Sequence, residues 1–278
     1  MALLHLFSSK KITSLVFILY IIWNSYLLAI QKQAFRDPRP FVYDSRIRQL
    51  QWQCPESYGF SSGHCWMAVL LYEPVISDFI GTKGWKKLLF LFLVLTSVLM
   101  PLSRMYLGMH SADQVVTGLL YSFIAVVLYR YHIQEKIYNL VAMTLKGHKK
   151  GFIFILTTLA FLLCLSIPII LYETNLHNRS FNQTHLNNLN KACSTNVDIF
   201  HMELHAGVDS SLVSLSFGLI YGLLLSSFNE IQRKKMKYYL RGNWSFNEDW
   251  KNIMLYLLAY ILIGGILLGV VLGFAANI

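Results

Sequence analysis

The chain is poor in charged residues and in cysteine. Only 14% of its 278 residues are Asp, Glu, Lys or Arg, whereas 55% are hydrophobic. This composition leaves no room for a soluble domain of appreciable size and is typical of a membrane protein. Four cysteines are too few for a disulfide framework. Cys54 and Cys193 are the only two expected in lumenal loops, so a bridge between them stays open, whereas Cys65 and Cys164 are expected to be buried.

Motifs for nucleotides and metals are missing as well. The sequence contains no internal repeat, no heptad run, no Walker motif and no zinc-type cluster of Cys and His. We therefore predict neither a metal site nor a cofactor.

Long apolar runs dominate what is present. A helical run of about 20 apolar residues spans a hydrocarbon core of about 30 Å. The first run is too long for a signal peptide and has no clear cleavage site, so we expect it to remain as a span. The pattern predicts an all-α, polytopic membrane helical bundle of about seven transmembrane helices. The runs are 12–30, 64–80, 87–102, 111–129, 151–172, 207–228 and 252–275.

The net charge of +10 follows the predicted topology. The basic residues do not gather on one face or tail, so we predict no nucleic acid partner. Most of the 24 Lys and Arg residues flank one side of the spans, which is then the cytosol. Sequons at Asn178 and Asn182 fall on the other side, so we expect glycosylation there and an active face toward the lumen or the outside. A third sequon, at Asn243, falls on the cytosolic side and is expected to stay unused.

Most of the other basic residues lie in two polar segments, and the first of these follows the first span. Arg39 stands between Pro38 and Pro40, which exclude a regular helix, so we expect its guanidinium on a stiff, extended piece of chain. Lys32 precedes it by seven positions.

A second polar segment comes directly before the second span. Ser62 and Gly63 are typical of a helix start, where exposed backbone N–H groups attract anions. His64 then falls in the first turn. A plain Ser N-cap beside an incidental His is the alternative interpretation.

The third segment joins the third and fourth spans. Arg104 and His110 would lie about 240° apart on one continuous helix, so they converge only if the chain bends, which Gly108 permits. Ser111 and Gln114 have the spacing of a capping box for the fourth span. The alternative is an interfacial Arg that snorkels and a His that only caps a helix.

Taken together, the three segments resemble the type 2 phosphatidic acid phosphatases. That superfamily also includes membrane-bound glucose-6-phosphatases, sphingosine-1-phosphate phosphatases and the vanadium haloperoxidases. The resemblance implies that His110 is a nucleophile forming a phosphohistidine, and that His64 protonates the leaving alcohol. It also implies phosphate binding by Lys32, Arg39, Ser62, Gly63 and Arg104, without a metal. The segments that carry it are Lys32-x6-Arg39-Pro40, Ser61-Ser62-Gly63-His64 and Ser103-Arg104-x5-His110.

Two positions depart from the family pattern. Ser61 stands where the family has Pro, which affects the stiffness of the loop more than its chemistry. Gln114 stands where the family has the carboxylate that orients the nucleophile, and Asp113 comes one position early. Glucose-6-phosphatases resemble this chain in carrying Gln at that place. Either Gln114 or Asp113 can orient His110, and we favour Gln114.

These observations predict a lipid phosphate phosphatase. Residues 1–131 would form the catalytic membrane core, and residues 132–278 three further helices with a glycosylated lumenal loop. The family usually has more helices before the first motif, so we expect an abbreviated core or a missing N-terminal part. The predicted substrate is phosphatidate, lysophosphatidate or a sphingoid-base phosphate, and the predicted location is the endoplasmic reticulum with the site facing the lumen.

Several alternatives stay open at this point. The substrate could be a sugar phosphate or a polyprenyl diphosphate, and a catalytically silent relative could bind or move lipid phosphates. Gly265, Gly269 and Gly273 form a small-residue face in the last span, which a homodimer could use.

Overall fold

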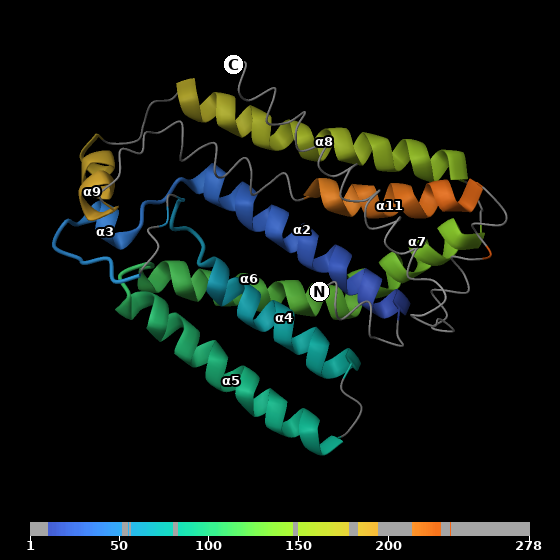
Figure 1. Cartoon of the computed structure of the whole chain (residues 1–278), viewed down its shortest axis with the longest axis horizontal. Helices are drawn as coiled ribbons and strands as arrows, with labels where there is room; N and C mark the ends of the chain where they lie inside the picture. Colours follow the sequence, from blue (N-terminus) through green and yellow to red (C-terminus); the bar gives the residue numbers. More distant parts are fainter. Residues whose placement is uncertain are drawn as a thin grey trace, which may run out of the picture. The chain divides into compact units, whose positions relative to one another are not determined.

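The computed structural model consists of helices joined by loops in its described part (Figure 1). It describes residues 11–51, 55, 57–79, 83–146, 150–177, 183–193, 213–228 and 234. Within these ranges every regular element is a helix, which confirms the predicted all-α class. The seventh predicted span, the sequons at Asn178, Asn182 and Asn243, Cys54 and the glycines at 265, 269 and 273 lie outside the described residues.

The helices begin and end close to the limits of the predicted spans. Among the described residues, four segments are long and apolar enough to cross a membrane, namely Lys11–Tyr43, Gly84–Tyr106, Ala112–Thr144 and Gly151–Asn175. The helices are α2 Lys11–Phe35, α3 Pro40–Tyr43, α4 Gly63–Phe79, α5 Lys83–Tyr106, α6 Ala112–Leu128, a π-helical turn Tyr129–Ile133, α7 Gln134–Lys146, α8 Lys150–His177, α9 Gln183–Cys193 and α11 Val213–Phe228.

Two of the predicted spans are represented by shorter helices within the described residues. With 17 residues, α4 is about 25 Å long, a little less than a hydrocarbon core. The apolar helix Val213–Leu225 within α11 is shorter still. The fourth predicted span, by contrast, continues beyond its predicted end through the π-helical turn into α7.

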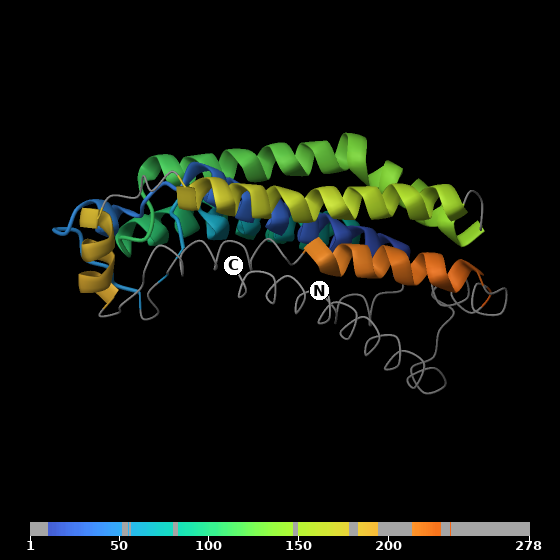
Figure 2. The same cartoon turned by 90° about the horizontal axis from the view of Figure 1, so that it is seen from above.

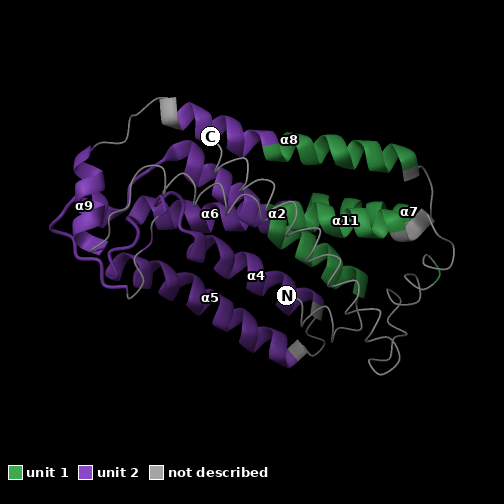
Figure 3. Ribbon diagram, turned by 45° about the horizontal axis from the view of Figure 1, so that its top comes forward, with its two compact units in different colours: residues 1–23, 129–165, 211–278 green, residues 24–128, 166–210 purple. Residues whose placement is uncertain are grey.

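The chain divides into two compact units (Figure 3). Unit 1 is Met1–Trp23, Tyr129–Leu165 and Ser211–Ile278, and unit 2 is Asn24–Leu128 and Ser166–Ser210. Each unit draws on both sides of residue 131, so the predicted division into a catalytic part and an additional part remains a prediction about function.

Aromatic stacking and apolar packing hold the described part of unit 1 together. The rings of Tyr20 and Tyr129 stack with their centroids 4.1 Å apart. Leu15, Val141 and Leu223 form a buried cluster that joins α2, α7 and α11.

Unit 2 is built around α4, which packs against both α5 and α6. Glycine at position 118 of α6 makes the close approach of α6 to the start of α4 feasible, because a Cβ there would lie 2.7 Å from the backbone oxygen of Ser62. At the same end the backbone N–H of Ser62 donates to the carbonyl of Gln114, at 3.0 Å. The polar ends of α4 and α6 are thereby fixed to each other.

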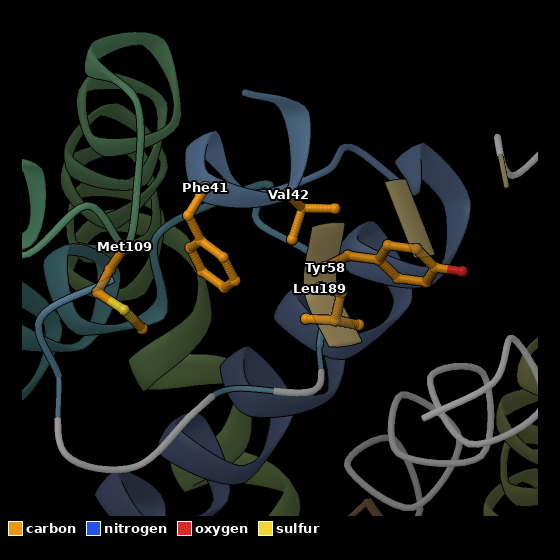
Figure 4. Packing of buried hydrophobic residues seen from close by; sticks show 5 residues of the cluster. All are labelled: Phe41, Val42, Tyr58, Met109 and Leu189. Carbon is orange, nitrogen blue, oxygen red and sulfur yellow. The ribbon is translucent and has the colours of Figure 1, made fainter. Parts of the chain in front are cut away.

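The short helices α3 and α9 cover one end of unit 2 (Figure 2). Between them lies a buried cluster of Phe41, Val42, Tyr58, Met109 and Leu189 (Figure 4). Asn188 of α9 also donates to the carbonyl of Val42, at 3.0 Å. This cluster anchors the loop around Tyr58 and the residue next to His110.

The cysteines differ in state. Cys193, at the end of α9, is bonded in a disulfide. Cys65 and Cys164 are buried thiols outside any disulfide, as expected from their apolar surroundings.

Candidate active site

The three polar segments of the sequence meet at one cavity in unit 2. Its volume is about 390 Å³, and both histidines and all three of the predicted phosphate-binding cations line it. Its lining is Leu28, Lys32, Arg39, Gln51, Pro55, Ser57, Gly63, His64, Met67, Arg104, Met109 and His110.

Arg39 is held rigidly on the extended piece of chain that its neighbouring prolines predict. Its backbone has φ −73° and ψ 155°, and the residue is 5% exposed. The guanidinium donates to the carbonyl of Ser57 at 2.7 Å and to the Ser57 hydroxyl at 3.0 Å. Its Nη1 atom reaches the carbonyl of Met109 at 3.1 Å and Nε2 of His110 at 3.3 Å. The charge therefore lies directly beside the imidazole.

Lys32 reaches the cavity from the last turn of α2, which extends to Phe35. The neighbouring residue Gln33 is fully buried and ties this end of α2 to α8. Its side chain donates to the carbonyl of Pro168 at 3.2 Å, and Asn175 donates to its backbone carbonyl at 2.9 Å. These two hydrogen bonds hold in place the end of α2 from which the side chain of Lys32 reaches the cavity.

The second segment forms the start of α4, as predicted. The helix begins at Gly63, and the carbonyl of Ser62 accepts the N–H of Trp66 at 2.9 Å. His64 is exposed in the first turn and lines the cavity together with Gly63. Ser62 is fully buried and is not among the lining residues, and Gln114 already occupies its N–H.

The predicted bend between α5 and α6 is present. Gly108 has φ +69°, a left-handed conformation that glycine adopts without strain. The bend brings Arg104, in the last turn of α5, and His110 to the wall of the same cavity. Nη1 of Arg104 also donates to the side-chain oxygen of Gln51, at 3.2 Å.

Gln114 lies against His110, whereas no hydrogen bond joins the side chain of Asp113 to that ring among the described contacts. Nδ1 of His110 is 3.2 Å from Oε1 of Gln114. That oxygen also accepts the N–H of Ser111 at 3.3 Å, which is the half of a capping box expected from the spacing. The side chain of Asp113 is exposed, so the geometry favours Gln114 as the partner of the ring.

The surroundings keep His110 uncharged. It lies between two candidate spans and is 4% exposed. Burial lowers its pKa to about 3, helped by the charges of Arg39 and Lys32, whereas hydrogen bonds to Gln114 and to the backbone of Gly59 oppose the shift. At neutral pH one nitrogen of the ring is therefore unprotonated and has a lone pair available.

Positive charge dominates the cavity, which suits an anion with several oxygens. Lys32, Arg39 and Arg104 line it, and no carboxylate is among its described lining residues. Within the described part of the chain, no group of three or more His, Cys, Asp and Glu side chains is placed to hold a metal ion. A phosphate group matches this charge and the N–H donors of the arginines.

Sequence reasoning missed four contributors to the site. Ser57 fixes Arg39, Gln51 contacts Arg104, and the carbonyl of Met109 accepts from Arg39. The fourth is Asp37, which binds the amide of Gln114. Loop positions of this kind carry no local signal, because their partners are distant in the sequence.

One comparison with known proteins gives a match. A family model described as the PAP2 superfamily matches residues 13–138, a range that contains all three polar segments. No curated protein and no solved structure matches the chain.

Proposed function

We propose that this integral membrane protein, whose residues 13–138 belong to the PAP2 superfamily, hydrolyses a lipid phosphate monoester. Membership of that superfamily supports a phosphatase-type activity in general. The reaction would proceed without a metal, through a phosphohistidine at His110. The observation that carries the proposal is the neutral His110 beside Arg39, in a cavity that His64 also lines.

In the first step the cavity binds the phosphate group. A phosphate monoester carries a charge of about −1.5 to −2 at pH 7, and three cations line the cavity. A phosphoryl group in transfer spreads negative charge over its equatorial oxygens, so preorganised positive charge lowers the barrier. Arg39 is already held by Ser57, so its positive charge is beside the cavity before the anion binds.

In the second step Nε2 of His110 attacks phosphorus. A nitrogen–phosphorus bond forms and the bond from phosphorus to the alcohol oxygen breaks. His64, which must be protonated for this step, gives its proton to the leaving oxygen. In the third step His64 takes a proton from water, the water oxygen attacks phosphorus, and the nitrogen–phosphorus bond breaks. The products are the alcohol and inorganic phosphate, and both histidines return to their starting states.

Apolar side chains of the cavity support a lipid as the substrate. Leu28 of α2 and Met67 of α4 line the wall alongside the cations. A substrate with a charged head and a hydrocarbon tail satisfies both kinds of lining. Burial of a tail contributes about 0.8 kcal/mol per CH₂ group, which a sugar phosphate cannot provide.

The first experiment measures phosphate release by membranes that contain the full chain, in the presence of a chelator. The substrates are phosphatidate, lysophosphatidate, sphingosine-1-phosphate, glucose-6-phosphate and a polyprenyl diphosphate, and His110→Ala is the control. We expect chelator-resistant release from one of the first three, absent in the control.

Three outcomes would contradict parts of the proposal. Release from glucose-6-phosphate or the diphosphate alone would contradict the lipid monoester, and sensitivity to the chelator would contradict the metal-independent mechanism. No release above the control from any substrate would contradict the enzyme and favour a silent lipid-phosphate binder.

A further inference from the structure

We propose that Asp37 is a positioning residue for His110 and acts through the side chain of Gln114. The three residues form what we call the Asp37 relay, and the inference rests on the proposed function. Oδ2 of Asp37 accepts a hydrogen bond from Nε2 of Gln114 at 2.6 Å, and Oε1 of Gln114 is 3.2 Å from Nδ1 of His110. The carboxylate expected at position 114 is thus replaced by one that comes from 77 positions earlier.

The partners of Gln114 define which way its amide points. On one side its Nε2 meets two acceptors, Oδ2 of Asp37 and the carbonyl of Pro38, at 2.6 and 3.0 Å. On the other side its Oε1 meets the backbone N–H of Ser111, a donor, at 3.3 Å. Exchanging the amide nitrogen and oxygen would set oxygen against two acceptors and nitrogen against a donor, so the amide has one favourable orientation.

That orientation defines the tautomer of His110. Oε1 of Gln114 can only accept, so the neutral ring must carry its proton on Nδ1. Nε2 then holds the lone pair, and it is the atom that faces Nη1 of Arg39 at 3.3 Å. The proposed reaction needs this tautomer, because the lone pair must be on the nitrogen beside the phosphate-binding cation.

The relay is tightly enclosed. Gln114 is 2% exposed, and a Cβ at position 59 would lie 2.6 to 2.9 Å from the atoms of its amide. Glycine at position 59 leaves room for the amide, and the N–H of Gly59 donates to the carbonyl of Asp37 at 2.8 Å. This hydrogen bond holds the backbone from which the carboxylate of Asp37 reaches Gln114.

The first test compares Asp37→Ala with Asp44→Asn in the full chain. Asp44 lies in the same loop region, but among the described residues its side chain binds only the exposed Arg46. On the substrate found active, we expect Asp37→Ala to lower kcat by roughly 10- to 100-fold with little change in KM. The control should stay within about twofold of wild type. A kcat within twofold of wild type for Asp37→Ala would overturn the proposal.

A double-mutant cycle separates the relay from a merely structural role. In Gln114→Glu two carboxylates face each other and in Asp37→Asn the charge is lost, so each single variant should be impaired. In the double variant the amide introduced at position 37 can donate to the carboxylate introduced at position 114, and that carboxylate accepts from Nδ1 of His110. If the two substitutions acted independently, the relative kcat of the double variant would be the product of the relative kcat values of the single variants. We expect the kcat of the double variant to be at least 10-fold higher than that product predicts. Multiplicative losses would overturn the proposal.

A readout independent of turnover distinguishes failure of the relay from failure of the proposed function. Nitrogen-15 NMR of histidine-labelled protein, assigned with His110→Ala, reports which ring nitrogen carries the proton. We expect a protonated Nδ1 and an unprotonated Nε2 in wild type, and a mixture in Asp37→Ala. That result supports the relay even if no phosphate is released, whereas the opposite tautomer in wild type overturns it even in an active enzyme.

Discussion

At the scale of single residues, His110 is a base that the fold keeps neutral. Burial and the charges of Arg39 and Lys32 oppose its protonation. The same two cations are the groups that would bind the phosphate. In the proposed reaction, one arrangement would therefore supply both the lone pair of the nucleophile and the positive charge that attracts the phosphate.

This arrangement links the stability of the protein to pH. The pKa of His110 is about 3 in the folded state and about 6.5 when unfolded, so between these values the unfolded chain binds one more proton. Stability that is present above pH 6.5 is then lost as pH falls, by about 1.4 kcal/mol per pH unit. Thermal unfolding in detergent should show wild type losing stability relative to His110→Gln between pH 6.5 and 4.5. Parallel curves would contradict the prediction.

At the scale of elements, the bend between α5 and α6 brings Arg104 and His110 to one cavity. Gly108 has φ +69°, and a Cβ there would lie 2.5 Å from the carbonyl oxygen of Arg48. The left-handed conformation costs a side-chain-bearing residue about 1 to 2 kcal/mol. The close contact with the carbonyl oxygen of Arg48 adds to this cost, because a backbone atom cannot move aside as a flexible side chain can.

Gly108→Ala should therefore impair both folding and activity. We expect a loss of about 2 kcal/mol or more in unfolding free energy, and at least a 10-fold fall in kcat/KM because the two functional residues shift apart. Gly84→Ala near the start of α5 is the matched control, since no atom of the described residues lies within 4 Å of a Cβ there. Equal midpoints of unfolding and equal rates for the two variants would show that the bend tolerates a side chain.

Local chemistry explains which elements could be predicted from sequence. The start of α4 at Gly63, the extended chain at Arg39 and the bend at Gly108 each depend on residues within a few positions, and each was predicted. The π-helical turn at Tyr129 and the helix α9 in a loop of polar residues were not predicted. The contacts of Asp37 and Ser57 join positions far apart in the chain, so only the folded structure reveals these contacts.

At the scale of the whole molecule, the ends of α2 and α8 that lie in unit 2 are joined. Asn175 of α8 donates to the carbonyl of Gln33, next to Lys32 of the cavity. The chain reaches Asn178 three residues after Asn175, and three residues span at most about 11 Å. We therefore expect the sequons at Asn178 and Asn182, which lie outside the described residues, to be on the same side of the membrane as the cavity.

This shared side makes glycosylation a test of where the cavity opens. We expect a glycosidase-sensitive increase in mass that is lost in the double variant Asn178→Gln/Asn182→Gln and kept in Asn243→Gln. Such a result would place the cavity on the lumenal side, because glycans are added only there, and would agree with the cytosolic position that the basic residues predict for Asn243. A glycan at Asn243 instead would reverse the topology, and the cavity would then face the cytosol.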